Sequence, residues 1–321
     1  MDKASLRIVY MGTPDFAVES LRVLVDSGYH VVAVVTMPDK PSGRGHHLQQ
    51  SPVKQYALSK NIPILQPEKL KDESFVEELR SYNADLQVVV AFRMLPEVVW
   101  TMPRLGTINL HGSLLPQYRG AAPINWAIIN GDKQTGVTTF FLKHEIDTGD
   151  MILQERMPIA DDEDFGSVHD RMMEMGAKVL LKTVDMIVDG TAPSIPQPVL
   201  PTEAMRPAPK IFKEMCELDF SKTAQELKNF VRGLSPVPAA WTELKIGEES
   251  SVVKIYRVSV SETGGNVVEN IMIGGRRVST DGKTYLRVEC ADKWLSIDEL
   301  QMQGKKRMGI RDFLNGVRLT V

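Results

Sequence analysis

The sequence predicts an α/β protein: a doubly wound, mostly parallel, Rossmann-like sheet, followed by a smaller OB-like β-barrel domain. In the front half, short apolar runs alternate with segments of helical periodicity, which is the pattern of a parallel sheet with crossover helices. The run at 86–92 is Val-rich and uninterrupted, as expected of a strand covered on both faces. In the last part of the chain, strand patterns separated by glycine turns dominate instead, which is typical of a small barrel.

These patterns place the elements of the front half in order. The expected strands are 6–11, 31–36, 62–65, 86–92, 107–111, 138–142 and 151–157. The expected helices are 16–25, a helix that begins at Ser51-Pro52, 73–81 and 165–188. Serine is a favoured N-cap and proline is tolerated in the first turn, so Ser51-Pro52 indicates a helix start. Alternation of this kind predicts that successive strands lie parallel in one sheet.

A proline-rich stretch divides the chain. Six prolines fall within residues 190–209, and such a segment tends to be extended rather than regular. We therefore expect a first domain at 1–189, a linker at 190–209 and a barrel domain at 210–321. Within the last domain, a short helix is expected at 224–231, and strands are expected at 241–246, 252–260, 270–273, 286–289 and 294–302.

Composition is that of an ordinary globular protein. The chain has 321 residues, of which 43% are hydrophobic and 25% charged, and this excludes a disordered or collagen-like chain. No apolar run reaches the length of a membrane span, and the N-terminus lacks a secretory signal, so we expect no membrane association. The two cysteines, Cys216 and Cys290, are too few for a disulfide framework or a zinc ribbon. A reducing, cytoplasmic compartment is the expectation.

Charge is divided unevenly along the chain. The net formal charge is −3, but residues 1–206 carry −6 and residues 207–321 carry +3. Lys305, Lys306 and Arg307 lie close together in the basic part. A basic appendage on an acidic body indicates a polyanionic partner. The alternative is a solvated surface with no partner.

Polar residues stand out where an apolar strand ends. Asn109 and His111 lie two residues apart in the expected strand 107–111, so they face the same side of the sheet. Ligands of open parallel sheets bind beyond the carboxyl ends of strands. Asp147 follows the next strand in an Asp-Thr-Gly turn, which is also ordinary turn chemistry. These three are candidate catalytic groups, and the alternative is a hydrogen-bonded pair of core residues beside a simple turn.

Together the three residue types suit attack of an amine on an acyl carbon. An Asn amide can donate to a developing oxyanion, and a histidine moves protons near neutral pH. A carboxylate can stabilise the imidazolium and accept a proton. No covalent nucleophile is evident, since Ser113 lies in Ser-Leu-Leu-Pro rather than Gly-x-Ser-x-Gly. We therefore favour direct transfer over an acyl-enzyme.

Other readings of these residues have less support. The first turn lacks the Gly-x-Gly-x-x-Gly of a dinucleotide site. A metal site could be drawn from His111, His144, Asp147 and Asp150, but no metal-binding spacing supports it, and we expect no metal. Residues 37–47 read as a long basic loop, in which Arg44 lies between two glycines. Arg44 could reach a phosphate or a nucleic-acid end, or the segment is a plain surface loop.

The motifs resemble those of a known family. Asn109-x-His111, followed by Ser113-Leu-Leu-Pro-x-Tyr-Arg-Gly and later by Asp147-Thr-Gly, resembles the 10-formyltetrahydrofolate-dependent formyltransferases. Four further segments are similar to the branch that acts on methionyl-tRNA: Gly-Thr-Pro-Asp-Phe at 12–16, Pro-Asp-Lys-Pro-x-Gly-Arg-Gly at 38–45, Ser-Pro-Val-Lys at 51–54 and Gly-Ala-Ala-Pro-Ile at 120–124. The similarity continues through 208–211 and 304–306 into the barrel.

The resemblance implies a specific reaction: a formyl group passes from 10-formyltetrahydrofolate to the α-amine of initiator methionyl-tRNA, without a metal, in a protein expected to be a monomer. It implies Asn109, His111 and Asp147 as the catalytic residues. The residues it implies for folate binding are Ser113, Leu114, Leu115, Pro116, Phe92, Met94 and Leu95. Those it implies for tRNA binding are Lys40, Arg44, Lys210, Lys305 and Lys306. The chain departs from the family at Phe92-Arg93-Met94-Leu95-Pro96, which is one residue shorter than the usual segment, so Arg93 is expected to alter the pterin contacts.

Three rival functions remain open from the sequence. The same chemistry could act on a small amine, although the proline-rich linker and basic second domain argue against so small an acceptor. Water could replace the amine, which would make the protein a folate-dependent hydrolase. The chain could also be a non-catalytic RNA-binding protein, which would have no need of Asp147.

Overall fold

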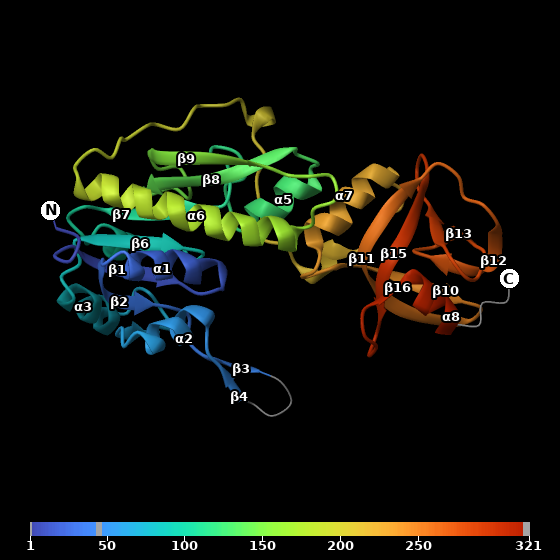
Figure 1. Ribbon diagram of the computed structural model, residues 1–321, viewed down its shortest axis with the longest axis horizontal. Helices are drawn as coiled ribbons and strands as arrows, with labels where there is room; N and C mark the ends of the chain where they lie inside the picture. Colours follow the sequence, from blue (N-terminus) through green and yellow to red (C-terminus); the bar gives the residue numbers. More distant parts are fainter. Residues whose placement is uncertain (1, 43–46, 317–321) are drawn as a thin grey trace. The chain divides into compact units, whose positions relative to one another are not determined.

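The computed structural model (Figure 1) describes residues 2–42 and 47–316, and these divide into two compact units. The first unit is drawn from Met1–Pro123, Thr135–Pro158 and His169–Pro207. The second is drawn from Ile124–Gln134, Ile159–Val168 and Ala208–Val321. Two short stretches of the front half therefore group with the C-terminal part of the chain.

The first unit is built on a sheet in the order β5-β2-β1-β6-β7-β8-β9. Its strands are β1 (Arg7–Gly12), β2 (His30–Val35), β5 (Ile64–Leu65), β6 (Leu86–Val90), β7 (Thr107–His111), β8 (Gln134–Phe141) and β9 (Met151–Pro158). The pairs from β5 through β7 are parallel, whereas β8 runs antiparallel to β7. The chain winds outward in both directions from β1 and β6. The expected doubly wound, mostly parallel sheet is confirmed.

Helices cover both faces of this sheet. Helices α1 (Phe16–Asp26) and α6 (Phe165–Val188) lie on the face turned to the viewer in Figure 1. On the opposite face, α3 (Glu73–Ser81) and α4 (Glu97–Trp100) bury Phe75, Leu79 and Val99 in one core with Val9 and Val89 of the strands. Coverage on both faces explains why β1, β2 and β6 are almost entirely apolar.

Local signals fix several element boundaries. The Ser51 hydroxyl accepts a hydrogen bond from the backbone N–H of Lys54 at 3.1 Å, and so caps α2 (Pro52–Ser59) as expected. The structure also gives α3, α6 and β7 the bounds that the periodicity predicts. These are segments whose apolar spacing is regular over their whole length.

The segment at 37–47 is not a loop without regular structure. Its described part forms a two-stranded antiparallel hairpin of β3 (Lys40–Ser42) and β4 (His47–Gln49), in which Lys40 pairs with Gln49. Strands of three residues are too short to show period-two alternation, so the sequence pattern missed them. The same reason applies to α4 and to α5 (Pro123–Ile129), which are each at most two turns long.

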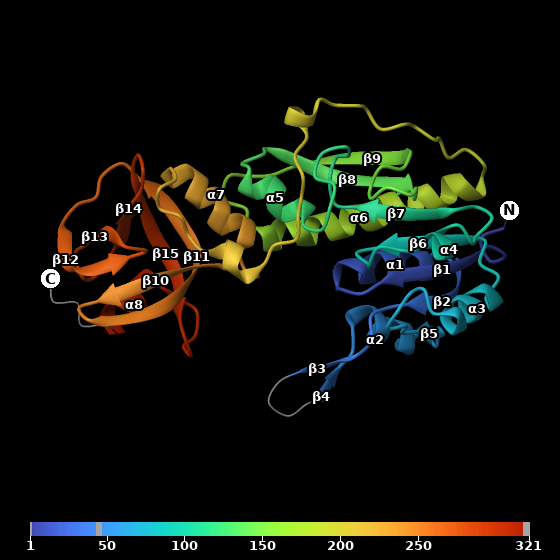
Figure 2. The same ribbon diagram turned by 180° about the vertical axis from the view of Figure 1, so that it is seen from behind.

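The second unit contains the barrel (Figure 2). Among its described residues, the strands follow the order β11-β10-β12-β13-β14-β15, and a pairing of β11 with β15 closes the ring. They are β10 (Ala240–Ile246), β11 (Glu249–Ser261), β12 (Val267–Ile273), β13 (Arg276–Thr280), β14 (Leu286–Glu289) and β15 (Trp294–Met302), followed by β16 (Met308–Gly309) and α8 (Ile310–Gly316). The expected barrel is confirmed with one more strand than the sequence indicated. Strand β13 was missed because its first two residues, Arg276 and Arg277, hide the apolar pattern.

Helix α7 (Ala224–Leu234) packs on the barrel core through Leu227, Val231 and Leu234. Its first turn is closed by a reciprocal capping box between Thr223 and Glu226. Among the described residues, no helix has the length and apolar character needed to cross a bilayer.

We predict that Gly149→Ala destabilises the first unit. A Cβ at Gly149 would lie 1.6 Å from the backbone carbonyl oxygen of Phe141, so the turn after β8 would have to move. The expected loss is roughly 3 kcal/mol, which corresponds to a fall in melting temperature of about 6–12 °C. Thermal unfolding measures it, with Gly309→Ala as the control because its added Cβ meets no atom within 4 Å. Equal melting temperatures for the two variants would contradict the packing described.

Candidate active site

Strand β7 presents two polar side chains on one face. Asn109 pairs in register with Val89 of β6, which belongs to the core under α3 and α4. Leu110 points to the other face, where its side chain lies close to Gly176 of α6. Strand alternation therefore puts Asn109 and His111 together on the face away from α6, as expected from their spacing.

The imidazole of His111 is held between a backbone carbonyl and a carboxylate. Its side chain is 7% exposed, and Nε2 lies 2.8 Å from the carbonyl oxygen of Tyr118. A carbonyl can only accept a hydrogen bond, so Nε2 carries the proton and donates it. The other ring nitrogen, Nδ1, faces Oδ2 of Asp147 at 3.8 Å. His111 thereby presents Nδ1 to the carboxylate of Asp147.

Asp147 lies in a tight turn between β8 and β9. Its backbone has a φ of 54°, in the left-handed region that non-glycine residues adopt at a cost. Its carboxylate is 11% exposed, and Oδ2 accepts a hydrogen bond from the backbone N–H of Gly120 at 3.0 Å. The same oxygen is the one nearest His111, so this N–H fixes where the carboxylate meets the imidazole.

The side-chain amide of Asn109 makes no hydrogen bond to the described residues, and the residue is half-buried. An unused amide donor two residues before His111 is available to a ligand at the end of β7. The structure thus brings His111 and Asp147 into contact and places Asn109 on the same face of the same strand as His111.

The Ser113–Pro116 segment is held by the neighbouring strand. Ser113 is fully buried and its hydroxyl donates to the carbonyl of Gln117 at 2.7 Å. The Thr138 hydroxyl donates to the carbonyl of Ser113 and accepts from the N–H of Leu115. Leu115 and Pro116 are also buried, whereas Leu114 is half-buried. The Ser113 hydroxyl and carbonyl are thus engaged inside the protein, and the assignment of this segment to folate binding stays a prediction.

The atypical segment after β6 is anchored by its arginine. The Arg93 guanidinium donates to the carbonyls of Glu68 and Pro67, at 2.9 and 2.8 Å, and lies over the ring of Phe92. Burial lowers the pKa of Arg93 from its ordinary value. Leu95 is buried in the core, while Met94 is 72% exposed. Arg93 thus holds this loop against the one that follows β5.

The hairpin that begins at Lys40 is fixed at its base by a closed polar network. The Lys54 ammonium donates to Asp39 at 2.6 Å and to Gln66 at 2.8 Å. The Gln66 amide donates to the other oxygen of Asp39 and to the carbonyl of Met37. Lys54 and Asp39 are only 15% and 18% exposed, and the Lys54 ammonium holds the pKa of Asp39 below its ordinary value. Lys40 itself is exposed, whereas Arg44 lies outside the described residues.

The expected basic residues of the second unit are on its surface. The Lys210 ammonium lies 5.3 Å from the centre of the Phe212 ring, and both residues are exposed. Lys305 and Lys306 are exposed in the turn between β15 and β16. Their neighbour Arg307 is engaged by Glu299 and the Tyr256 ring, which fixes the turn without using the two lysines.

Of the four residues considered for a metal, His111 and Asp147 face each other, whereas Asp150 and His144 have other partners. Asp150 pairs with Lys143 and accepts from Ser194, and the exposed His144 is nearest to Glu97. Among the described residues there is no cluster of three His, Cys, Asp or Glu side chains arranged to hold an ion.

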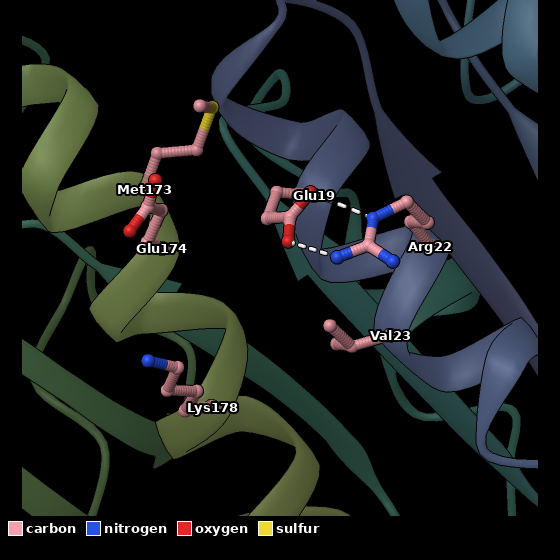
Figure 3. A pocket seen from close by; sticks show the side chains of 6 residues that line it. All are labelled: Glu19, Arg22, Val23, Met173, Glu174 and Lys178. Carbon is pink, nitrogen blue, oxygen red and sulfur yellow. Dashed lines mark hydrogen bonds and ion pairs between the residues drawn. The ribbon is translucent and has the colours of Figure 1, made fainter.

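A hollow of about 360 Å³ lies between α1 and α6 (Figure 3). Its polar lining includes Glu19 and Arg22, which pair with each other at 2.9 Å between Arg22 Nε and Glu19 Oε2. Its residues come from the face of the sheet opposite to Asn109 and His111. It is therefore separate from the site at the end of β7.

One residue of the site had no sequence signal. Gln197, in the proline-rich segment, donates from Nε2 to the carbonyls of Asp147 and Gly149 at 2.8 and 2.9 Å. Its Oε1 accepts from Arg119, the residue before Gly120. A lone glutamine among prolines has no motif to mark it, and only the structure reveals these contacts.

Comparison with known proteins matches both parts of the chain to formyl transferase family models. The "Formyl transferase" family model matches residues 6–184, and "Formyl transferase, C-terminal domain" matches residues 210–318. The chain is 59% identical to "Methionyl-tRNA formyltransferase" of Parabacteroides distasonis, over 99% of this chain and 98% of that protein. It is 57% identical to the protein of the same name from Bacteroides fragilis, over 100% and 98%.

Among solved structures, HypX from Aquifex aeolicus in complex with tetrahydrofolic acid matches with a TM-score of 0.62 and 17% identity. The match covers 96% of this chain and 47% of HypX, and it shows a shared fold. With both family models matched and relatives more than half identical over the full length, this chain belongs to the formyltransferase family.

Proposed function

We propose that this protein transfers a formyl group from 10-formyltetrahydrofolate to the α-amine of initiator methionyl-tRNA, for translation initiation. The observation that carries the proposal is the buried His111–Asp147 pair beside the unused amide of Asn109. Support for the donor comes from the folate-bound structure of similar fold, and support for the acceptor comes from the names of the full-length relatives. Because initiator tRNA is used in the cytoplasm, we propose that compartment.

The proposed reaction is a direct transfer. The amine nitrogen attacks the formyl carbon, a new C–N bond forms, and an oxyanion develops on the formyl oxygen. The Asn109 amide and the protonated His111 stabilise that oxyanion. Because Tyr118 occupies Nε2–H, His111 acts through Nδ1. Asp147 accepts the amine proton, directly or through water. Collapse of the intermediate then re-forms the formyl carbonyl and breaks the bond to N10 of the folate, and the proton held by Asp147 passes to N10.

The folate is proposed to contact the loops that end β6 and β7. The half-buried Leu114 and the exposed Met94 present their side chains, while Phe92, Leu95, Leu115 and Pro116 shape the loop backbones. Ser113 contributes by holding its loop rather than by side-chain contact. The proposed reaction uses no metal ion.

The acceptor is proposed to contact basic residues of both parts of the chain, with the protein acting as a monomer. In the first unit these are Lys40 and Arg44, and in the second they are Lys210, Lys305 and Lys306. We further propose that the chain functions as a catalytic domain at 1–189, a connecting segment at 190–209 and a tRNA-binding domain at 210–321. The separate family matches to 6–184 and 210–318 support this division.

We predict that His111→Ala and Asp147→Asn each lower kcat by about 10²–10⁴ while the protein remains folded. Each change removes one member of the proton-transferring pair. The assay incubates the protein with 10-formyltetrahydrofolate and methionyl-tRNA and follows the formyl group to the aminoacyl-tRNA, to a small amine or to free formate. His144→Ala is the matched control, since that side chain is 86% exposed in the loop that leads to Asp147. Either variant at half the wild-type kcat would remove that residue from the mechanism.

We predict that Lys54→Met raises the KM for methionyl-tRNA about three- to tenfold with little change in the KM for the folate. The change opens the polar network at the base of the β3–β4 hairpin, so Lys40 is no longer held in place. Initial rates at varied concentrations of each substrate measure the effect. Lys69→Met is the control, because Lys69 is exposed and its loss removes the same charge. A similar KM in both variants would show that charge, not the network, is responsible.

The double variant Lys305→Gln/Lys306→Gln should bind tRNA more weakly and with less dependence on salt. Each cation that contacts a phosphate releases a counterion, so the slope of log K against log[salt] should become shallower by about 1–2 in total. Fluorescence titration at salt concentrations between roughly 50 and 200 mM measures the slope. An unchanged slope would place the phosphate contacts elsewhere.

A further inference from the structure

Residues 190–207 of the proline-rich segment belong to the first unit and are not a free tether. Ile195 exchanges backbone hydrogen bonds with Met151 at the start of β9, so the segment runs along that strand (Figure 1). Further on, the N–H of Tyr118 donates to the carbonyl of Arg206 at 2.7 Å. The Gln117 side-chain amide donates to the carbonyl of Ala204 and accepts from the backbone N–H of Arg206, each at 2.8 Å. Both ends of the segment are therefore fixed on the unit that carries the site.

Between these attachments, Gln197 joins the two loops of the active site. Its Nε2 donates to two carbonyls, of Asp147 and Gly149, and its Oε1 accepts from the Arg119 guanidinium at 2.6 Å. Carbonyls can only accept and a guanidinium can only donate, so the orientation of the amide is fixed by its partners. Every polar atom of this half-buried side chain is used.

These contacts close a ring around the catalytic carboxylate. Arg119 is followed directly by Gly120, whose N–H holds Oδ2 of Asp147. Gln197 ties that same stretch to the backbone of Asp147 itself. Gln197 donates hydrogen bonds to two carbonyls of the turn that contains Asp147. The backbone of Asp147 is left-handed, a conformation that persists only where neighbouring groups enforce it. The position of the carboxylate therefore depends on the glutamine amide.

We propose that Gln197 is a positioning residue for the transfer reaction, which holds the Asp147 carboxylate against Nδ1 of His111. The inference rests on the function proposed above and deepens it, because it gives the segment between the two matched stretches, 6–184 and 210–318, a part in the chemistry. Gln197 acts through Asp147 and touches neither substrate. A displacement of about 1 Å at a reacting group can lower the rate a hundredfold, so loss of this amide has a kinetic consequence.

The chain offers a matched control for a role in which Gln197 only attaches the proline-rich segment to the loop between β8 and β9. Ser194, three residues earlier, donates to the Asp150 carboxylate at 2.7 Å, so it joins the same segment to the same loop. Its contact reaches the Asp150 side chain and leaves the Asp147 and Gly149 carbonyls untouched. If attachment of the segment were all that mattered, Ser194→Ala and Gln197→Met would have similar effects.

The experiment compares wild type, Gln197→Met, Gln197→Glu and Ser194→Ala. Steady-state rates with 10-formyltetrahydrofolate and methionyl-tRNA give kcat and both KM values, and thermal unfolding reports stability. Gln197→Glu keeps an acceptor for Arg119 but has no donor for the two carbonyls, so it isolates the contacts to the Asp147 turn. In parallel, ¹⁵N NMR of the histidine side chains, with His111 assigned from the His111→Ala variant, reports the surroundings of the imidazole without substrate.

The expected result is a fall in kcat of about ten- to a hundredfold in both Gln197 variants, with each KM within threefold of wild type. The His111 imidazole resonances should shift in both, while Ser194→Ala stays within twofold in kcat and leaves those resonances in place. The inference is overturned by either Gln197 variant within twofold of the wild-type kcat, by an equal loss in Ser194→Ala, or by unmoved His111 resonances. Should wild type form no formylmethionyl-tRNA, the proposed function fails, and the NMR comparison alone decides the role of Gln197.

Discussion

The candidate site depends on one hydrogen bond, which the backbone N–H of Gly120 donates to the side-chain oxygen Oδ2 of Asp147. This bond joins the loop after β7 to the turn after β8, and it sets the carboxylate opposite an imidazole whose other nitrogen is already held by a backbone carbonyl. Backbone groups are better fixed in space than surface side chains, so the geometry of the pair follows from the path of the chain. That path in turn requires a residue without a side chain at Gly149 and a left-handed backbone at Asp147.

The sequence was most informative where apolar spacing is regular over a whole element. Strand 107–111 and helix 165–188 have the predicted bounds because alternation and a 3.6-residue repeat leave few other choices. The hairpin β3–β4 and helices α4 and α5 are too short for any period to emerge, and β13 begins with two arginines. Barrel closure by β11 and β15 is a long-range pairing that no local pattern encodes.

The same contrast applies within the site. Alternation along a single strand suffices to place Asn109 and His111 on one face, and this was predicted. The approach of Asp147 to His111 depends on how β8 packs beside β7, and composition says nothing of that. Ser113 fits the expected motif, yet its hydroxyl is taken by a neighbouring carbonyl, which only coordinates can reveal. Gln197 is the reverse case, because no motif marks it in the sequence. Its place in the site is evident only from hydrogen bonds to three residues that are distant in sequence.

The hairpin base shows what a half-buried ion pair provides that apolar residues would not. Desolvating Lys54 and Asp39 costs free energy, and apolar residues of similar volume would often be at least as stable. An apolar contact, however, tolerates sliding, whereas the Lys54–Asp39–Gln66 network is satisfied in one arrangement only. The candidate site follows the same logic, since the Gln197 amide has two carbonyl acceptors and one guanidinium donor that no rotated amide could satisfy. In both places directional hydrogen bonds fix the orientation of the side chains, which hydrophobic packing alone does not do.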